Sequence, residues 1–160
     1  MRSFGLSVVA VLTAVVFVYP ATANAASVVA TINGGGTAIM DPSQSDFGLA
    51  GTTSFGIHAT LYSDGTAQGH INCVDQVGST APGNIFGEVT SWEGSLDGSI
   101  TLNVVGKLVA FPGGHPQNVS FTVTIQHFGG AGVGQWTLAL GADTACFETL
   151  LSGQIVMRRS

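Results

Sequence analysis

Residues 118–126 read NVSFTVTIQ, a stretch in which apolar and polar side chains alternate without a break. Alternation with a period of two places every apolar side chain on one face of an extended chain and every polar side chain on the other. This pattern is typical of an antiparallel strand that packs one face on a core and exposes the other. The stretch therefore predicts a half-buried β-strand, with Phe121 at the centre of its buried face.

The same alternation occurs on both sides of this stretch, as in Phe55–Leu61, Ile100–Val104 and Trp136–Leu140, and glycine-rich turns separate the segments. The strands are predicted at 27–33, 36–41, 52–62, 66–76, 84–94, 99–111, 117–127, 135–141 and 145–157. Short connections favour pairing of consecutive strands. We therefore predict an all-β antiparallel meander of eight or nine strands, which forms a sandwich or a flattened barrel.

The expected core is apolar and comes from several strands: Phe55, Ile57, Phe121, Val123, Ile125, Trp136 and Leu138. Three segments rich in glycine or proline are predicted as surface loops, namely Asn33–Gly36, Pro112–Pro116 and Phe128–Gly134.

The turn Ser63-Asp64-Gly65 determines how its two flanking strands pair. A two-residue turn would set Ile57 opposite Asn72, whereas a three-residue loop with Gly65 in a left-handed conformation sets Ile57 opposite Ile71. Burial favours the second pairing, which also places His58 opposite His70 on the other face. Leu96-Asp97-Gly98, treated in the same way, predicts Trp92 opposite Leu102 and Phe86 opposite Leu108.

The first 25 residues are predicted to be a secretory signal peptide. Arg2 provides a positive charge, residues 4–18 are almost all apolar, and Ala23-Asn24-Ala25 is a small-x-small cleavage site. Residues 26–160 would then form one domain, exported to the periplasm, the cell wall or the medium. No membrane span is expected after cleavage.

The charge balance excludes one class of partner. Without Arg2, only Lys107, Arg158 and Arg159 carry positive charge, against nine acidic residues. A nucleic-acid partner is not expected, because phosphate binding needs clustered basic residues. The sequence leaves three kinds of partner to consider: an unknown protein, a glycan or a small apolar ligand.

Two residue pairs are candidates for a structural or a metal site. Cys73 and Cys146 are the two cysteines of the chain, and an even count in an exported domain predicts a disulfide between them. His58 and His70, if opposed, could bind zinc or copper, although two ligands alone make a weak site. No cofactor is otherwise expected.

The sequence resembles a β-rich domain of exported bacterial surface proteins, found alone or after choice-of-anchor modules and without an assigned function. The resemblance rests on Gly34-Gly35-Gly36-Thr37, on Gly69-His70-Ile71-Asn72 with Asp75, on the Phe121 strand and on Leu151-Ser152-Gly153-Gln154-Ile155. The glycine-rich loop at 129–134 lacks the acidic residues of the family pattern, so calcium is not expected there.

No catalytic motif marks the chain, and a non-enzymatic exported module that binds a partner or surface component is therefore the preferred interpretation. A small-ligand carrier with an apolar barrel interior is the second, and a small hydrolase or isomerase using His58, His70 or Asp75 is the third.

Overall fold

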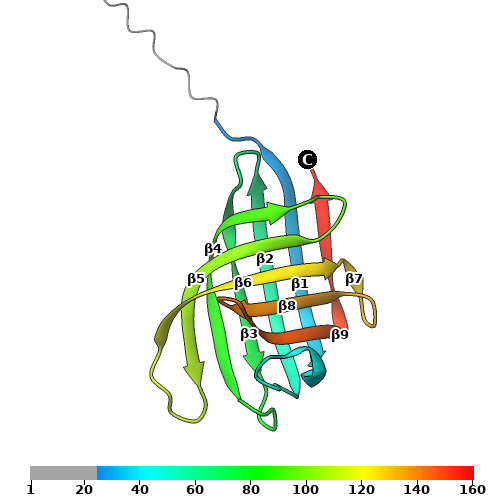
Figure 1. Cartoon of the computed structure of the whole chain (residues 1–160). Helices are drawn as coiled ribbons and strands as arrows, with labels where there is room; N and C mark the ends of the chain where they lie inside the picture. The colour runs from blue at the N-terminus through cyan, green and yellow to red at the C-terminus, as the bar shows by residue number, and fades with distance from the viewer. Residues whose placement is uncertain (1–24) are drawn as a thin grey trace, which may run out of the picture.

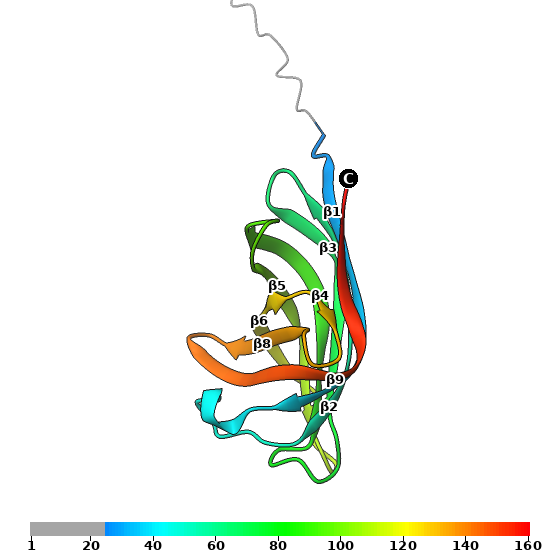
Figure 2. The same ribbon diagram turned by 90° about the vertical axis from the view of Figure 1, so that its right-hand side faces the viewer.

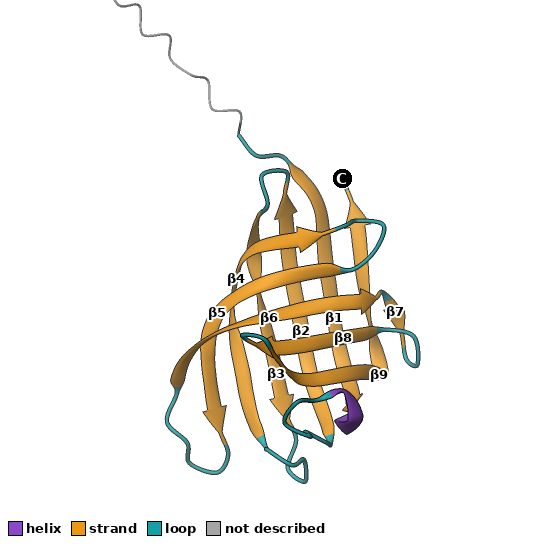
Figure 3. Ribbon diagram, viewed as in Figure 1, coloured by secondary structure: helices purple, strands orange, loops and turns teal. Residues whose placement is uncertain are grey.

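Nine strands follow one another along the described part of the chain, and their arrangement is drawn in Figures 1 and 3. The computed structural model describes residues 25–160, so the predicted signal peptide lies, except for Ala25, outside the described residues. The strands are β1 (Val28–Met40), β2 (Thr52–Tyr62), β3 (Thr66–Asp75), β4 (Gly83–Gly94), β5 (Ile100–Ala110), β6 (Gln117–His127), β7 (Gly129–Gly130), β8 (Gln135–Leu140) and β9 (Asp143–Arg159), with a 3-10 helix η1 (Pro42–Gln44) after β1.

The strands form one antiparallel sheet in the order β1-β2-β3-β4-β5-β6-β8-β9-β7. Strand β1 pairs with β2 on one side and with β9 on the other, so the sheet closes on itself. Strand β7 is a short addition to β9 outside this ring. The protein is therefore a closed, all-β antiparallel barrel, and the two architectures predicted from the sequence are resolved in favour of the barrel.

The barrel is flattened because some strands bend from one layer into the other. Figure 2 shows β9 running across the molecule and then turning upward beside β1. Its residues 143–149 pair with β8, and residues 148–159 pair with β1. Gly153 lies in the second half with a φ of 75°, and a Cβ there would come within 1.9 Å of the Gly35 oxygen. Glycine thus permits the close approach of β9 to β1 that closes the barrel.

The predicted hairpin register is confirmed. Ile57 lies opposite Ile71, and His58 lies opposite His70. In the next hairpin Trp92 lies opposite Leu102, as predicted, but the expected pairing of Phe86 with Leu108 is wrong. A bulge between Val89 and Ser91 shifts the register by one residue, so Ile85 takes the place opposite Leu108.

The predicted core residues are all buried, and Trp136 is among the residues with no exposed surface. Side chains of every long strand meet inside the barrel and form one apolar cluster. The interior is therefore packed rather than hollow. Among the described residues, no helix is long and apolar enough to cross a membrane.

The three predicted loops have different outcomes. Pro112–Pro116 is an exposed loop, which confirms the prediction. Asn33–Gly36 lies inside β1, so that prediction is wrong. Its glycines do not make a turn, but let β1 lie against Ile155 and Ser152 of β9. Phe128–Gly134 is a loop only in part, since Gly129–Gly130 form β7.

Candidate functional site

One end of the barrel carries a cavity lined mostly by apolar side chains. Its lining comes from the β1–β2 and β3–β4 connections and from β3, β4, β5, β8 and β9. The two connections lie at the lower end of the barrel in Figure 1. The volume of the cavity is about 240 Å³, and its apolar lining includes Phe47, Leu49, Ile85, Leu108, Leu138 and Leu140. We call it the end pocket. An adjoining cavity of about 360 Å³ shares Asp75, Ala81, Ile85 and Leu108 with it.

Two of the loops at this end carry exposed aromatic rings. Phe47, in the β1–β2 connection, is 53% exposed and lines the end pocket, and Phe111, after β5, is 42% exposed and lines the adjoining cavity. Apolar rings that remain in solvent at the edge of a cavity are a common feature of binding sites. The apolar surface of this end therefore continues from the pocket to its rim.

Two cysteines and two acidic residues form a polar group at the pocket. Cys73 and Asp75 come from β3, and Cys146 and Glu148 come from β9. Residues two apart on a strand share a face, so each pair points into the barrel together. Cys73, Asp75 and Cys146 line the end pocket, while Glu148 has no exposed surface. We call these four side chains the thiol–carboxyl cluster.

Short contacts join the members of the thiol–carboxyl cluster. The Cys73 Sγ lies 3.8 Å from an oxygen of Asp75 and 3.9 Å from an oxygen of Glu148. The second Glu148 oxygen accepts a hydrogen bond from the hydroxyl of Thr53, itself fully buried on β2. Glu148 is therefore contacted by Thr53 at one carboxyl oxygen and by Cys73 at the other.

Burial changes the protonation of the cluster. It raises the pKa of Glu148 to about 7, although the hydrogen bond from Thr53 opposes the shift. Burial also raises the pKa of Asp75 to about 6. The pKa values of the Cys73 and Cys146 thiols are raised as well, by burial first and by the charge of Glu148 second. Near neutral pH, both cysteines are thus neutral thiols and poor nucleophiles.

The predicted disulfide between Cys73 and Cys146 is wrong, because both cysteines are free thiols in the structure. The physical reason is visible in their contacts. Cys73 lies against Asp75 and Glu148. Its sulfur therefore has carboxyl groups, and not the Cys146 sulfur, as its polar partners.

Glu148 and Thr53 were not among the site residues selected from the sequence. A signal was present, because Cys146, Glu148 and Leu150 share one face of β9 and Thr53 shares a face with Phe55 and Ile57. A carboxyl group in an otherwise apolar inward row is unusual, since acidic residues are almost never fully buried without a partner. That interruption of the alternating pattern could have identified Glu148.

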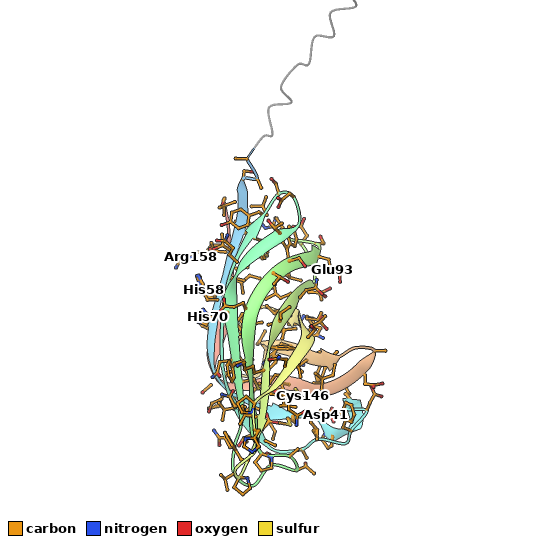
Figure 4. All side chains as sticks on the ribbon, turned by 90° about the vertical axis from the view of Figure 1, so that its left-hand side faces the viewer. Asp41, His58, His70, Glu93, Cys146 and Arg158 are labelled. Carbon is orange, nitrogen blue, oxygen red and sulfur yellow. The ribbon has the colours of Figure 1, made fainter. Side chains whose placement is uncertain are left out.

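His58 and His70 line neither the end pocket nor the adjoining cavity. Both are exposed on the outer face of β2 and β3, away from the barrel interior (Figure 4). Their ring centroids are 5.9 Å apart, and the Nδ1 of His58 lies 2.8 Å from the Oδ1 of Asn33. Within residues 25–160, the three side chains close enough together to hold a metal ion are Cys73, Asp75 and Glu148 instead. Zinc or copper binding by the histidine pair stays a prediction.

No family model matches the chain, and comparisons with curated protein sequences and with solved structures found no significant match. The resemblance to the exported bacterial surface domain therefore stays a prediction. What the chain can do must be argued from the end pocket and the thiol–carboxyl cluster themselves.

Proposed function

We propose that the protein is an exported binding protein that holds a small, neutral, mostly apolar molecule in the end pocket. The observation that carries this proposal is a cavity of about 240 Å³ with an apolar wall and polar groups gathered at one side. Sites for small molecules are concave and mainly apolar, with a few polar groups that orient the ligand. The end pocket combines these features.

The size of the pocket limits the ligand. Drug-sized molecules occupy sites of roughly 300–1,000 Å³, so a cavity of about 240 Å³ suits something smaller. The barrel interior offers no alternative place, because Trp136, Leu61 and Ile125 fill it without exposed surface. The ligand is therefore expected at the end of the barrel and not along its axis.

The charges around the pocket limit the ligand further. Neither the end pocket nor the adjoining cavity is lined by a lysine, arginine or histidine, and both are lined by Asp75. An anionic molecule such as a fatty acid would lose its hydration there without gaining a cationic partner. A hydroxyl or amide group could instead hydrogen bond to Asp75 or to a cysteine. These features support a neutral ligand with one polar group.

The described residues of the pocket support binding more than catalysis. Nucleophilic catalysis by a cysteine needs a nearby base such as histidine, and the two histidines considered from the sequence lie on the outer face. Asp75, the third residue considered for hydrolase or isomerase chemistry, does line the pocket, where its carboxyl group could hydrogen bond to a ligand.

A fluorescence titration tests the proposal. The neutral dye N-phenyl-1-naphthylamine is expected to brighten on binding to the wild type, whereas the anionic dye 1-anilinonaphthalene-8-sulfonate is expected to bind at least about tenfold more weakly. Ala81→Trp places a large ring at an exposed position on the pocket wall and is expected to abolish the neutral dye's signal. The matched control is Ala142→Trp, in the exposed turn between β8 and β9, which should bind as the wild type does.

Two results would contradict the proposal. One is equal binding of the neutral dye by Ala81→Trp and Ala142→Trp, which would place the dye outside the end pocket. The other is stronger binding of the anionic dye than of the neutral one by the wild type, which would mean that the acidic side of the pocket does not select the ligand.

A further inference from the structure

We propose that Cys73, Asp75 and Glu148 form a binding site for a thiophilic divalent cation, zinc above all, at the inner side of the end pocket. The inference does not depend on the organic ligand proposed above, because it concerns a different set of atoms and can be tested in the absence of any ligand. It also differs from the histidine pair predicted from the sequence.

The geometry of the donors is the first argument. One ligand atom from each of the three side chains lies within 4.8 Å of the other two, and the Cys73 sulfur lies 3.8 Å and 3.9 Å from oxygens of Asp75 and Glu148. Zinc lies about 2.3 Å from a thiolate sulfur and about 2.0–2.2 Å from a carboxylate oxygen, so small side-chain shifts bring the three donors onto one ion. Two of them stand on β3 and one on β9, strands whose packing in the barrel limits their movement.

The thiol–carboxyl cluster has no positively charged partner among the described residues. Glu148 has no exposed surface, and Cys73 is 1% exposed. The ion pair found among the described residues joins Arg159 to Asp97 on the surface and does not involve this cluster. A buried charge is costly unless a cation or hydrogen bonds compensate it. A bound divalent ion would supply the missing positive charge, and binding would release the thiol proton of Cys73 to solvent.

Glu148 is held in place by a hydrogen bond from Thr53. The Thr53 hydroxyl donates to one oxygen of Glu148, which leaves the other oxygen, on the side of Cys73, for an ion. Outer partners that orient a ligating side chain are a regular feature of metal sites. Thr53 thus occupies the position of such a partner.

The donor set selects the metal. A thiolate favours zinc or copper(I) over calcium and magnesium, which prefer sites made only of oxygen. Three protein ligands leave one position of a tetrahedral zinc ion free, and Cys73 and Asp75 both line the end pocket. The free position is therefore expected to face the pocket, where water or a ligand atom could occupy it.

The test is zinc binding to the metal-free wild-type chain, followed by calorimetry and by zinc X-ray absorption. We expect one zinc ion per chain, with one sulfur at about 2.3 Å and oxygen atoms in the remaining positions. Cys73→Ser is expected to weaken binding by about 100-fold or more. His70→Ala is the matched control, since it removes a metal-binding side chain on the outer face, and it should bind zinc as the wild type does.

The absorption spectrum of the wild type gives a result even if Cys73→Ser fails to fold. A shell of nitrogen and oxygen without sulfur would place the ion at the histidines and overturn the proposal. Two sulfur atoms would put Cys146 in the fourth position and overturn the assignment of a free coordination site. A folded wild type that binds no zinc at micromolar concentrations would also overturn it.

Discussion

Glu148→Gln is expected to make the metal-free protein more stable above neutral pH and to leave its stability unchanged in acid. Burial raises the pKa of Glu148 from 4.5 to about 7, so the native state favours the protonated carboxyl more than the unfolded chain does. The stabilising contribution of the proton is complete below about pH 4.5. It is lost as the pH rises through about 7, because the buried group must then ionise.

The size of the effect follows from the shift in pKa. One pKa unit corresponds to about 1.4 kcal/mol, so the wild type is expected to lose on the order of 3 kcal/mol between about pH 4.5 and about pH 8 from Glu148 alone. Asp75, with a pKa of about 6, adds a loss in the same direction in both proteins. Glutamine cannot ionise and still accepts the hydrogen bond from Thr53. The variant therefore does not lose the unfolding free energy that the wild type loses when Glu148 ionises.

Urea unfolding of both proteins with a chelator present, at about pH 4 and about pH 8, measures this difference. Glu93→Gln is the matched control, because Glu93 is an exposed glutamate at the end of β4. We expect it to follow the wild type at both pH values. If Glu148→Gln also followed the wild type, Glu148 would ionise as freely as a surface group, and its assigned burial would be wrong.

Trp136→Ala is expected to cost about 3–5 kcal/mol of unfolding free energy. The Trp136 ring has no exposed surface, and its centroid lies 5.5 Å from that of Phe55. Removing the ring leaves a cavity between β8 and β2, and the closed ring of paired strands cannot collapse to fill it. A cost below about 1 kcal/mol would contradict the position of Trp136 in the core.

The indole nitrogen allows a sharper comparison. The Nε1 of Trp136 has no hydrogen-bond partner, whereas the Nε1 of Trp92 donates to the Tyr62 carbonyl at a distance of 2.8 Å. Trp136→Phe therefore loses volume but no hydrogen bond, and Trp92→Phe loses a bond worth about 1 kcal/mol. Denaturant unfolding of the two variants separates the packing of the ring from its polar contact.

The parts of the fold that follow from local pattern could be predicted from the sequence. Strands β2 and β6 begin and end at the predicted residues 52–62 and 117–127. The pairing of β2 with β3 was also correct, because a one-residue change in the turn at Gly65 would have moved the apolar side chains to the wrong face. Strict alternation next to a turn with one favourable geometry is therefore enough to predict both a strand and its pairing.

The parts that depend on distant contacts could not be predicted. The bulge between Val89 and Ser91 changes which residues of β4 point inward, since Ile85 and Val89 are buried and Trp92 is the next to pack against the core. The prediction assumed an unbroken register from Trp92, and so the shift of Ile85 was missed. Closure of the barrel requires β1 to meet β9 at Gly36 and Gly153, which are far apart in the sequence. The glycines that make this approach possible resemble turn residues in the sequence, which explains why Asn33–Gly36 was predicted as a loop.

In the candidate sites, too, the local pairing could be predicted from the sequence and the distant contacts could not. Pairing of consecutive strands placed His58 opposite His70 correctly. The thiol–carboxyl cluster joins β3 to β9, which are neither consecutive in the chain nor neighbours in the sheet. Compartment and cysteine count predicted that Cys73 and Cys146 belong together, but they did not show that Cys73 lies against Glu148.

The central claim is that the open end of the barrel binds a small neutral molecule, and a methyl NMR titration with N-phenyl-1-naphthylamine tests it most directly. We expect shifts in the methyl signals of Ile85, Leu108 and Leu138, which line the end pocket. The signals of Ile32 and Ile100, which are fully buried and do not line the pocket, should stay in place. Shifts confined to methyl groups outside the pocket, such as the exposed Val105 on the outer face, would contradict the claim.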